Sequence, residues 1–388
     1  MEIGRAQIGI IGAGAMGSGI AQVAAQSGHQ VILIDQNPEA LERSERALAS
    51  VADRLLEKGR WSKAQHASIQ QSIHRSSDWN DLAGCKLIIE AIIEDFEIKR
   101  NVFQKLEQTV DVNVLLASNT SSLSLTGIAG CLIHPKRFLG LHFFNPAPLM
   151  DLVEVIPALQ TNADHVVEMV ELMNEWGKKP VIAKDTPGFI VNRVARPFYG
   201  EALRIFEEGI ANKQTIDAAM RDQGFRMGPF ELMDLIGNDV NYAVTQSVFE
   251  AFYYDPRYRP SLIQKRHVEA GWLGKKSGRG YYDYSSKDGA EPIDKHKFQE
   301  VSERIIALLI NEAADALYLN IASAQDLETA MTKGVNYPKG LLRWANEWGI
   351  DRTLQVLNQL RERYHEDRYR PSPILSQLNA NNSTFLID

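Results

Sequence analysis

The chain has 388 residues, of which 44% are hydrophobic and 23% charged, a composition typical of a globular protein with two or three domains. The 42 Lys and Arg residues against 49 Asp and Glu residues give a net charge of -7, so the charge does not favour nucleic acid or an anionic membrane as a partner. Only 2 cysteines, no metal-ligand spacing and no long apolar segment predict a cytoplasmic protein without disulfides, a bound metal or a membrane span.

The first predicted element is a strand, turn and helix unit. Residues 7–11 are predicted to form a buried strand, residues 20–27 a helix and residues 31–34 a second strand. Glycine in the turn removes the Cβ atoms that would keep the backbone away from a phosphate group at a helix N-terminus. The turn is the G-x-G-x-x-G run Gly12, Ala13, Gly14, Ala15, Met16 and Gly17. It predicts a dinucleotide site, against the alternative of a glycine turn needed only for packing.

An acidic residue ends the second strand. Asp35 lies 23 residues after Gly12, where a carboxylate accepts hydrogen bonds from the adenosine ribose. The same carboxylate would repel a 2′-phosphate, and neither Gln36 nor Asn37 supplies a cation to bind one. The predicted cofactor is therefore NAD rather than NADP.

Further apolar runs continue the sheet. They lie at residues 87–93, 114–117, 138–144, 152–156 and 181–183 and alternate early with helical patterns. Residues 41–58 form an amphipathic pattern that predicts a helix inserted after the second strand. The predicted fold class is α/β, with a doubly wound Rossmann-type NAD-binding domain at residues 1–186 and a mainly parallel sheet.

The rest of the chain is predicted to be an all-α domain present in two tandem copies. Strand-like runs nearly vanish after residue 188, and residues 190 to about 233 have helical spacing. A shift of 111 residues, or 112 at two glycines, superimposes Glu201 on Glu312, Ala219 on Ala330, Arg257 on Arg368, Gly228 on Gly340 and Gly237 on Gly349. We predict a helical domain at 187–290, a second helical repeat at 291–388, and a linker in the glycine-rich and polar segment 274–297.

Four further segments hold polar residues in specific strings. They are Ser-Asn-Thr-Ser-Ser-Leu at 118–123, Gly-Leu-His-Phe-Phe-Asn-Pro at 140–146, Leu-Val-Glu-Val at 152–155 and Asp-Thr-Pro-Gly-Phe-Ile-Val-Asn-Arg at 185–193. Together with the glycine turn, they resemble the L-3-hydroxyacyl-CoA dehydrogenases, also called 3-hydroxybutyryl-CoA dehydrogenases, over residues 5 to about 284. The second repeat resembles that of larger hydroxyacyl-CoA dehydrogenases and of the multifunctional proteins of fatty acid β-oxidation.

The resemblance implies an oxidoreductase that converts L-3-hydroxyacyl-CoA to 3-ketoacyl-CoA with NAD, or runs the reverse. Removing the hydroxyl proton needs a base that titrates near neutrality, and His142 lies in an apolar segment that should end at the mouth of the sheet. Glu154 is an acid within an apolar run, where a protonated histidine would be a suitable partner. The pattern alone also fits a core histidine and an edge-strand acid facing solvent. The resemblance implies that His142 is the catalytic base and that Glu154 orients it.

Two more residues of these segments are implied to act on the substrate. Ser121 follows the predicted strand at 114–117, on the side of a doubly wound sheet that faces the cofactor. By resemblance, Ser121 contacts the substrate 3-oxygen, and Asn192 hydrogen-bonds the substrate near the reacting carbon. Both residue types are also common in turns and helix caps, which is the alternative for each.

The resemblance also implies contacts to the cofactor and to coenzyme A. Glu94 and Lys99 match positions near the nicotinamide ribose, and Asn145 follows the catalytic segment. Lys276 matches a cofactor-binding lysine, with Lys275 as a close competitor.

For coenzyme A, Lys58 matches a lysine that holds the nucleotide phosphate, and Ser50 lies near the matching serine. The alternative for such residues is an ordinary solvated helix face. The resemblance supplies the acyl-CoA partner and not the length of its acyl chain, so an adipyl-type substrate is as compatible as a butyryl one.

The second repeat has no preceding nucleotide-binding module and no Pro-Gly-Phe-Ile-Val-Asn string, so it is predicted to have no active site. One-module members of the family dimerise through their helical domains. We therefore predict that residues 298–388 pack on residues 190–270, giving a monomer that contains a pseudo-dimer; a homodimer is the alternative.

Two other functions share part of the pattern. Dehydrogenases of the 3-hydroxyisobutyrate or 6-phosphogluconate type share the nucleotide turn but resemble enzymes with a catalytic lysine. A non-catalytic NAD-binding protein, like the lens crystallin relative of the family, would keep the turn without turnover. The presence of both His142 and Glu154 favours the hydroxyacyl-CoA dehydrogenase over these alternatives.

Overall fold

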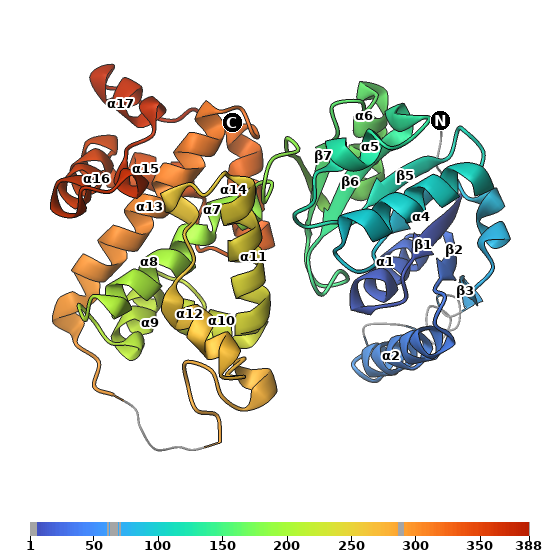
Figure 1. Ribbon diagram of the computed structural model, residues 1–388, viewed down its shortest axis with the longest axis horizontal. Helices are drawn as coiled ribbons and strands as arrows, with labels where there is room; N and C mark the ends of the chain where they lie inside the picture. The colour runs from blue at the N-terminus through green and yellow to red at the C-terminus, as the bar shows by residue number, and fades with distance from the viewer. Residues whose placement is uncertain (1–5, 60–61, 63–68, 70, 286–290, 388) are drawn as a thin grey trace. The chain divides into compact units, whose positions relative to one another are not determined.

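The computed structural model describes residues 6–59, 62, 69, 71–285 and 291–387, and the chain divides into two compact units, Met1–Asp185 and Thr186–Asp388 (Figure 1). Residues 286–290 of the predicted linker lie outside the described residues. The predicted division of the second unit near residue 290 stays a prediction. No helix in the described ranges has the length and apolar character needed to cross a membrane.

The first unit is built on an eight-stranded sheet with the order β3-β2-β1-β4-β5-β6-β7-β8. Neighbouring strands are parallel except for β6 and β7, which are antiparallel. The strands are β1 (Gln7–Ile11), β2 (Gln30–Ile34), β3 (Ile73–Ser76), β4 (Leu87–Glu90), β5 (Leu115–Ser118), β6 (Phe138–Phe143), β7 (Leu152–Pro157) and β8 (Lys179–Ile182). The strand order reverses between β1 and β4, where a doubly wound sheet opens a crevice for a ligand.

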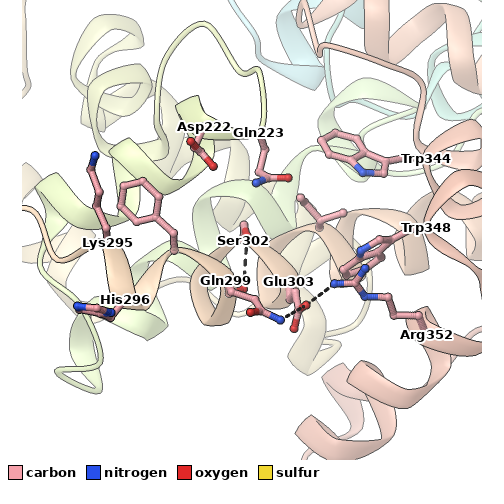
Figure 2. Close-up of a pocket in the computed structure, with 12 residues that line it drawn as sticks. Asp222, Gln223, Lys295, His296, Gln299, Ser302, Glu303, Trp344, Trp348 and Arg352 are labelled. Atoms are coloured by element: carbon pink, nitrogen blue, oxygen red, sulfur yellow. Dashed lines mark hydrogen bonds and ion pairs between the residues drawn. The ribbon is translucent and has the colours of Figure 1, made fainter.

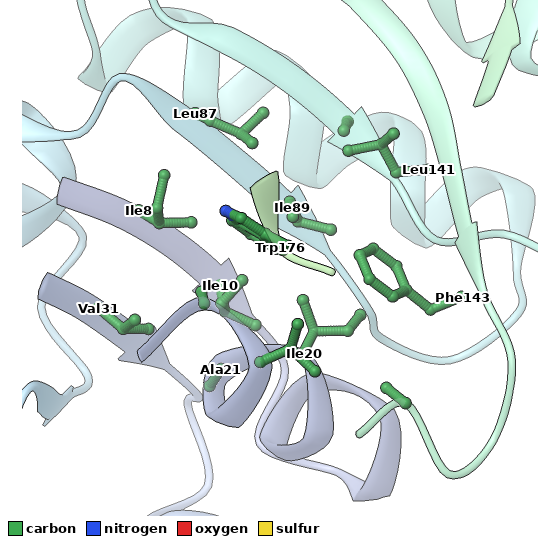
Figure 3. Close-up of a cluster of buried hydrophobic side chains, with 14 of the residues drawn as sticks. Ile8, Ile10, Ile20, Ala21, Val31, Leu87, Ile89, Leu141, Phe143 and Trp176 are labelled. Carbon is green, nitrogen blue, oxygen red and sulfur yellow. The ribbon is translucent and has the colours of Figure 1, made fainter. Parts of the chain in front are cut away.

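Helices cover both faces of this sheet. They are α1 (Ala15–Gln26), α2 (Pro38–Glu57), α4 (Phe96–Thr109), α5 (Leu125–Ala129) and α6 (Ala163–Glu175). On one face, side chains of α1, α2 and α6 join those of the central strands in a buried cluster that includes Ile8, Ile10, Ile20 and Trp176 (Figure 3). On the other face, Phe103 of α4 packs edge-on against Phe138 of β6. The predicted α/β fold with a mainly parallel sheet is confirmed.

Two features of this unit differ from the prediction. Helix α1 begins at Ala15 rather than near residue 20, because its first turns contain Gly17 and Gly19, which hide the helical pattern. Strand β3 was not predicted, because only Ile73 of its four residues is both apolar and buried.

The second unit contains helices and no extended strand among its described residues. Its helices are α7 (Val191–Val194), α8 (Arg196–Glu207), α9 (Lys213–Asp222), α10 (Pro229–Ile236), α11 (Asn238–Ala251), α12 (Leu262–Glu269), α13 (Phe298–Tyr318), α14 (Ala324–Gly334), α15 (Leu341–Trp348), α16 (Ile350–Tyr364) and α17 (Pro373–Ala380). The helix predicted at 190 to about 233 is thus four helices. Asn212 caps α9 by accepting a hydrogen bond from the Thr215 N–H, and Pro229 starts α10, so both positions restart the helix.

Helix α13 is the core of the second unit. It is buried on nearly every side from Val301 to Ala316, and its buried charged residues Arg304, Glu312 and Asp315 form ion pairs with the first repeat. It packs against α8 and α9 of the first repeat and against α15, α16 and α17 of the second. The second repeat therefore packs on the first, as the sequence analysis predicted.

The glycine-rich half of the predicted linker is not a linker. Asp234 of α10 accepts hydrogen bonds from the Tyr281 and Tyr282 N–H groups at 2.9 Å each. A Cβ atom on Gly274 or Gly280 would collide with Asp234, so glycine is needed here for close packing rather than for flexibility.

Candidate active site

The glycine turn after β1 is shaped for a close approach of a ligand. Gly12 has φ of +103°, and a Cβ atom there would lie 2.5 Å from the Ala91 carbonyl oxygen. A Cβ atom on Gly17 would collide with the Gly12 carbonyl, whereas one on Gly14 would meet nothing within 4 Å. Gly14 is the N-cap of α1 and offers no side-chain acceptor. The open side of Gly14 and the N–H groups of the first turn therefore suit a pyrophosphate.

Asp35 closes the turn and borders a cavity. Its Oδ2 accepts a hydrogen bond from the Ala13 N–H at 2.8 Å, and its Oδ1 accepts one from the Asn37 N–H at 2.9 Å. The cavity has a volume of about 410 Å³ and is lined by Gly12, Asp35, Gln36 and mainly apolar side chains such as Ile92 and Ile98. An apolar pocket with a carboxylate at its rim fits the adenosine half of NAD.

Glu94 accepts several hydrogen bonds from the loop that follows β5. Its Oε1 accepts hydrogen bonds from the Thr120 hydroxyl at 2.7 Å and from the Ser121 N–H at 2.8 Å, and also from the Ser121 hydroxyl and both donors of Ser122 at 3.1 Å each. Burial raises the pKa of Glu94, but the charge of Lys99 and these hydrogen bonds outweigh burial and hold the pKa below its usual value. Glu94 is therefore an ionised residue that fixes Ser121.

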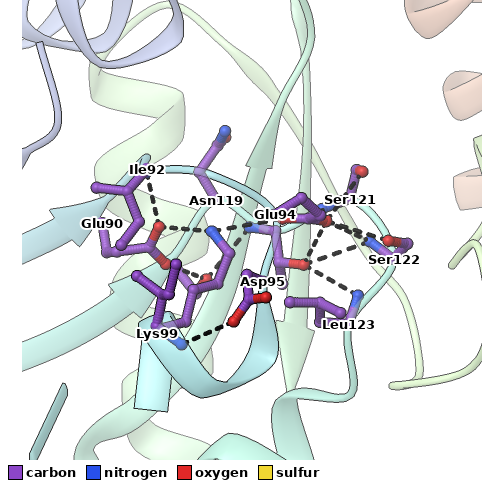
Figure 4. A network of polar contacts seen from close by, with 12 residues as sticks. Glu90, Ile92, Glu94, Asp95, Lys99, Asn119, Ser121, Ser122 and Leu123 are labelled. Atoms are coloured by element: carbon purple, nitrogen blue, oxygen red, sulfur yellow. Dashed lines mark hydrogen bonds and ion pairs between the residues drawn. The ribbon is translucent and has the colours of Figure 1, made fainter. Parts of the chain in front are cut away.

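Lys99 is buried beneath this loop (Figure 4). Its Nζ lies 2.5 Å from Glu90 Oε1 and 3.4 Å from Glu94 Oε2, and its side chain is 1% exposed. The alternative of a solvated helix face is therefore wrong for Lys99. The structure brings Glu94, Lys99 and Ser121 together, and their roles toward cofactor and substrate stay predictions.

His142 and Glu154 face each other across two antiparallel strands. The register of β6 and β7 pairs the two residues directly, and His142 Nδ1 lies 2.6 Å from Glu154 Oε2. Glu154 is 0% exposed and His142 is 6% exposed. Strand β8 pairs with the other side of β7, so the alternative of an edge-strand acid facing solvent is wrong. A carboxylate only accepts, so the imidazole Nδ1 carries the proton of this hydrogen bond.

The remaining predicted residues of the first unit lie on its surface. Asn145 is exposed two residues beyond the end of β6. Ser50, on α2, and Lys58, just after it, are exposed, which leaves both accessible to a ligand.

Two predicted residues belong to the second unit. Asn192 lies in the short helix α7 and is half-buried. Lys276 forms an ion pair with Asp239, with its Nζ 2.6 Å from Asp239 Oδ1, whereas the Lys275 ammonium lies over the Tyr284 ring. The roles of Asn192 toward the substrate and of Lys276 toward the cofactor stay predictions.

Sequence reasoning missed several residues that support the site. Glu90 and Ser118, at the ends of β4 and β5, are fully buried and hydrogen-bonded to each other at 2.6 Å. The available signal was an acid that ends a fully apolar strand. Trp79 and Lys105 line the cavity beside Asp35, with the Lys105 ammonium 3.9 Å from the centre of the Trp79 ring. No local pattern marked either of these two residues.

Comparison with known proteins identifies the family of the chain. The profile described as "3-hydroxyacyl-CoA dehydrogenase, NAD binding domain" matches residues 7–186. The profile of the C-terminal domain of the same family matches twice, at residues 188–284 and 301–384. The chain belongs to the 3-hydroxyacyl-CoA dehydrogenase family. It is an NAD-dependent enzyme, and both helical repeats are copies of the family's C-terminal domain.

Individual members of the 3-hydroxyacyl-CoA dehydrogenase family match between 72% and 97% of the chain. A 3-hydroxyadipyl-CoA dehydrogenase of Escherichia coli K12 is 39% identical over 97% of this chain and 98% of its own length. A probable 3-hydroxybutyryl-CoA dehydrogenase of Deinococcus radiodurans is 41% identical and matches 72% of this chain with 100% of its own length. The crystal structure of a 3-hydroxybutyryl-CoA dehydrogenase from Escherichia coli K12 superimposes with a TM-score of 0.92 at 37% identity, covering 97% of this chain and 99% of that one.

These relatives favour the hydroxyacyl-CoA dehydrogenase over the two alternatives considered from the sequence. The lysine-dependent dehydrogenases and the non-catalytic crystallin-like protein gain no support. As a 3-hydroxyacyl-CoA dehydrogenase, the chain oxidises a hydroxyacyl-CoA with NAD.

Proposed function

We propose that the enzyme interconverts L-3-hydroxyacyl-CoA and 3-ketoacyl-CoA, with His142 as the general base in oxidation and the general acid in reduction. The observation that carries this proposal is the 2.6 Å hydrogen bond between His142 Nδ1 and the buried carboxylate of Glu154. A buried carboxylate stabilises the protonated imidazole and fixes which ring nitrogen holds the proton. With Nδ1 directed to Glu154, Nε2 is the nitrogen that exchanges the proton with the substrate hydroxyl.

The other predicted residues have supporting roles in this proposal. NAD, when bound, accepts the hydride from the substrate carbon. Ser121 contacts the 3-oxygen, and Asn192 hydrogen-bonds the substrate near the reacting carbon, where negative charge develops.

The cofactor and coenzyme A contacts complete the proposed site. The dinucleotide is bound by the turn from Gly12 to Gly17, by Asp35 and by four further residues, Glu94, Lys99, Asn145 and Lys276. Lys58 and Ser50 bind the nucleotide part of coenzyme A. Their exposure on and just after α2 supports this assignment.

The test compares His142→Gln with the native enzyme, using acetoacetyl-CoA and NADH. We expect kcat to fall about 10²- to 10⁴-fold, because general acid–base catalysis contributes that much. Glu154→Gln keeps the shape of the side chain and removes its charge, so a loss in the same direction is expected.

His29→Gln is the matched control. His29 is also a buried histidine of the first unit, but it bonds to the Ala6 carbonyl and to the Trp176 indole N–H. It should cost stability and leave kcat within a few-fold of the native value. Unchanged turnover in His142→Gln would refute the assignment of the base.

The names of the relatives suggest two substrates. One relative is named for 3-hydroxyadipyl-CoA and others for 3-hydroxybutyryl-CoA. We propose that the substrate lies in this range, from a four-carbon acyl group to a six-carbon dicarboxylic one. Values of kcat/KM over a series of 3-ketoacyl-CoA lengths, including a dicarboxylic one, distinguish the two.

We also propose that one chain is the working unit. The second repeat packs on α8 and α9, where a one-module relative would use a second subunit. A cytoplasmic location stays a prediction.

A further inference from the structure

A closed ring of hydrogen bonds and ion pairs lies beneath the loop that carries Ser121 (Figure 4). Glu90 Oε2 accepts the Ser118 hydroxyl at 2.6 Å, and Ser118 Oγ accepts the Thr120 N–H at 3.2 Å. The Thr120 hydroxyl donates to Glu94 Oε1 at 2.7 Å. Lys99 closes the ring, with its Nζ 3.4 Å from Glu94 Oε2 and 2.5 Å from Glu90 Oε1.

Four of the five ring residues are removed from water, while the side chain of Glu94, at the edge of the ring, is 35% exposed. The residues Glu90, Ser118, Thr120 and Lys99 are each at most 1% exposed. The ring contains two carboxylates, of Glu90 and Glu94, and one ammonium, of Lys99. The carboxylates therefore need further hydrogen-bond donors. Glu90 Oε1 receives the Ile92 N–H at 2.8 Å, and Glu94 receives the Ser121 and Ser122 donors. Such a buried network holds one arrangement, because each member loses a charged partner if it moves.

The same loop is attached to the strand that carries His142. The Asn119 N–H donates to the Glu90 carbonyl at 2.7 Å, and Asn119 Oδ1 accepts the Phe143 N–H at 2.8 Å. Residues 118–122 are thus fixed at one side to Glu90 and at the other to the residue next to His142. The Glu90 side chain is linked to the loop in two ways. It bonds to Ser118 directly, and it pairs with Lys99, which in turn pairs with Glu94.

We propose that Glu90 is a positioning residue for the reaction, which holds Ser118 and Lys99 so that Ser121 has its working position before substrate binds. Glu90 is 0% exposed, so its side chain acts through the ring and not by contact with substrate. The inference rests on the proposed role of Ser121 at the substrate oxygen. A ring that merely stabilised the unit would affect unfolding, and would leave the turnover of the folded enzyme unchanged.

The test uses Glu90→Gln in the full chain, with Glu107→Gln as the matched control. Glu107 is a second buried acid of the same unit, with a side chain that is 3% exposed. Its carboxylate accepts the Ile133 and His134 N–H groups at 2.7 and 2.8 Å, and both donors lie outside the loop at 118–122. Both substitutions keep the side-chain shape and remove a buried charge, so both should lower the unfolding temperature.

We expect kcat of Glu90→Gln with acetoacetyl-CoA and NADH to fall about tenfold or more, because small misplacements of a catalytic group cost this much. KM for acetoacetyl-CoA should change less than kcat, since the Glu90 side chain is fully buried and has no surface to offer coenzyme A. Amide hydrogen exchange of residues 118–123 should be faster in Glu90→Gln than in the native enzyme. In Glu107→Gln, kcat and the exchange of this segment should both stay native.

A milder variant covers the case in which Glu90→Gln does not fold. Ser118→Ala removes one hydroxyl of the ring, and we expect a smaller loss of kcat together with faster exchange at 118–123. Native kcat and native exchange in the folded Glu90→Gln or Ser118→Ala variant would overturn the inference, as would equal losses of kcat in Glu90→Gln and Glu107→Gln. The His142→Gln result separates this failure from that of the proposed function, because it does not depend on the ring.

Discussion

The two helical repeats of the second unit keep the same interface with each other. Arg193 Nε lies 2.7 Å from Glu312 Oε1, and Arg304 Nε lies 2.5 Å from Glu201 Oε1. A shift of 111 residues converts one pair into the other, since 193 plus 111 is 304 and 201 plus 111 is 312. Each contact is therefore made twice, as in an isologous dimer interface.

The repeats differ at the position of Asn192. The same shift places Glu303 there, at the edge of a cavity of about 500 Å³ that also contains Trp348 and Arg352 (Figure 2). Glu303 Oε1 accepts the Gln299 amide at 2.9 Å and pairs with the Arg352 guanidinium at 2.5 Å. The second repeat therefore keeps the residues needed for packing and not the residue proposed for chemistry.

The largest effect is expected at the shared interface. Arg304→Met would leave the fully buried Glu201 without its main partner, and we expect the free energy of unfolding to fall by about 3–5 kcal/mol. Burial raises the pKa of Glu201, but Arg304 and Arg204 outweigh burial and hold the pKa below its usual value, so the carboxylate stays charged at neutral pH. Urea denaturation measures the loss.

The control for this variant is a surface arginine of the same unit. Arg266 pairs with Glu269, with side chains 76% and 44% exposed, so Arg266→Met should change the free energy of unfolding by less than about 0.5 kcal/mol. Light scattering of the native protein should give the mass of one chain. Stability of Arg304→Met equal to that of Arg266→Met would show that the interface does not depend on these pairs.

The next effect concerns turnover at the two equivalent positions. Asn192→Ala should lower kcat about 10²- to 10³-fold, the range for loss of one donor to developing charge. Glu303→Ala should leave kcat within about twofold, because its carboxylate bonds to Gln299 and Arg352, which both belong to the second repeat. Steady-state kinetics with acetoacetyl-CoA measures both. A similar loss in the two variants would mean that the second repeat contributes to catalysis.

Much of the fold was predictable from local patterns. Strands buried on both faces form unbroken apolar runs, so the runs at 87–93 and 138–144 marked β4 and β6. The breaks between α7 and α10 were not predicted, because apolar spacing continues through Asn212 and Gly228 while the caps there restart the helix. The shift of 111 residues predicted the repeat. It did not predict that Arg193 and Arg304 each pair with a glutamate of the other repeat, because those pairs depend on how the repeats pack.

The site was predictable where a segment resembles those of a known family. His142 and Glu154 met this condition, although the pattern alone left both open, and the structure places them in contact. Glu90 was not predicted, because its partner Ser118 lies 28 residues further along the chain. A hydrogen bond between two strand ends depends on which strands are neighbours, and a single sequence does not state that order.

The smallest of these effects, when taken per pH unit, is a pH dependence that both repeats share. Asp217 accepts the Phe230 N–H at 2.9 Å and the Glu231 N–H at 3.1 Å, at the start of α10. Its counterpart in the second repeat, Glu328, accepts the Leu342 N–H at 2.8 Å at the start of α15. Burial raises the pKa of Asp217 to about 7 and also raises the pKa of Glu328.

A raised pKa means that the folded state binds a proton that the unfolded state has already lost. The stability from Asp217 is thus full below about pH 4 and is lost as pH rises to about 7, by at most about 1.4 kcal/mol per pH unit. Urea midpoints at pH 5, 6, 7 and 8 should show this loss in the native protein and a smaller loss in Asp217→Asn, where only Glu328 still contributes. Asp222→Asn, an exposed acid of the same helix, should keep the full loss. If the urea midpoint keeps its full pH dependence in Asp217→Asn and loses it in Glu328→Gln, the titrating group belongs to the second repeat. The carboxylate at the start of α15 would then be more strongly buried than the one at the start of α10.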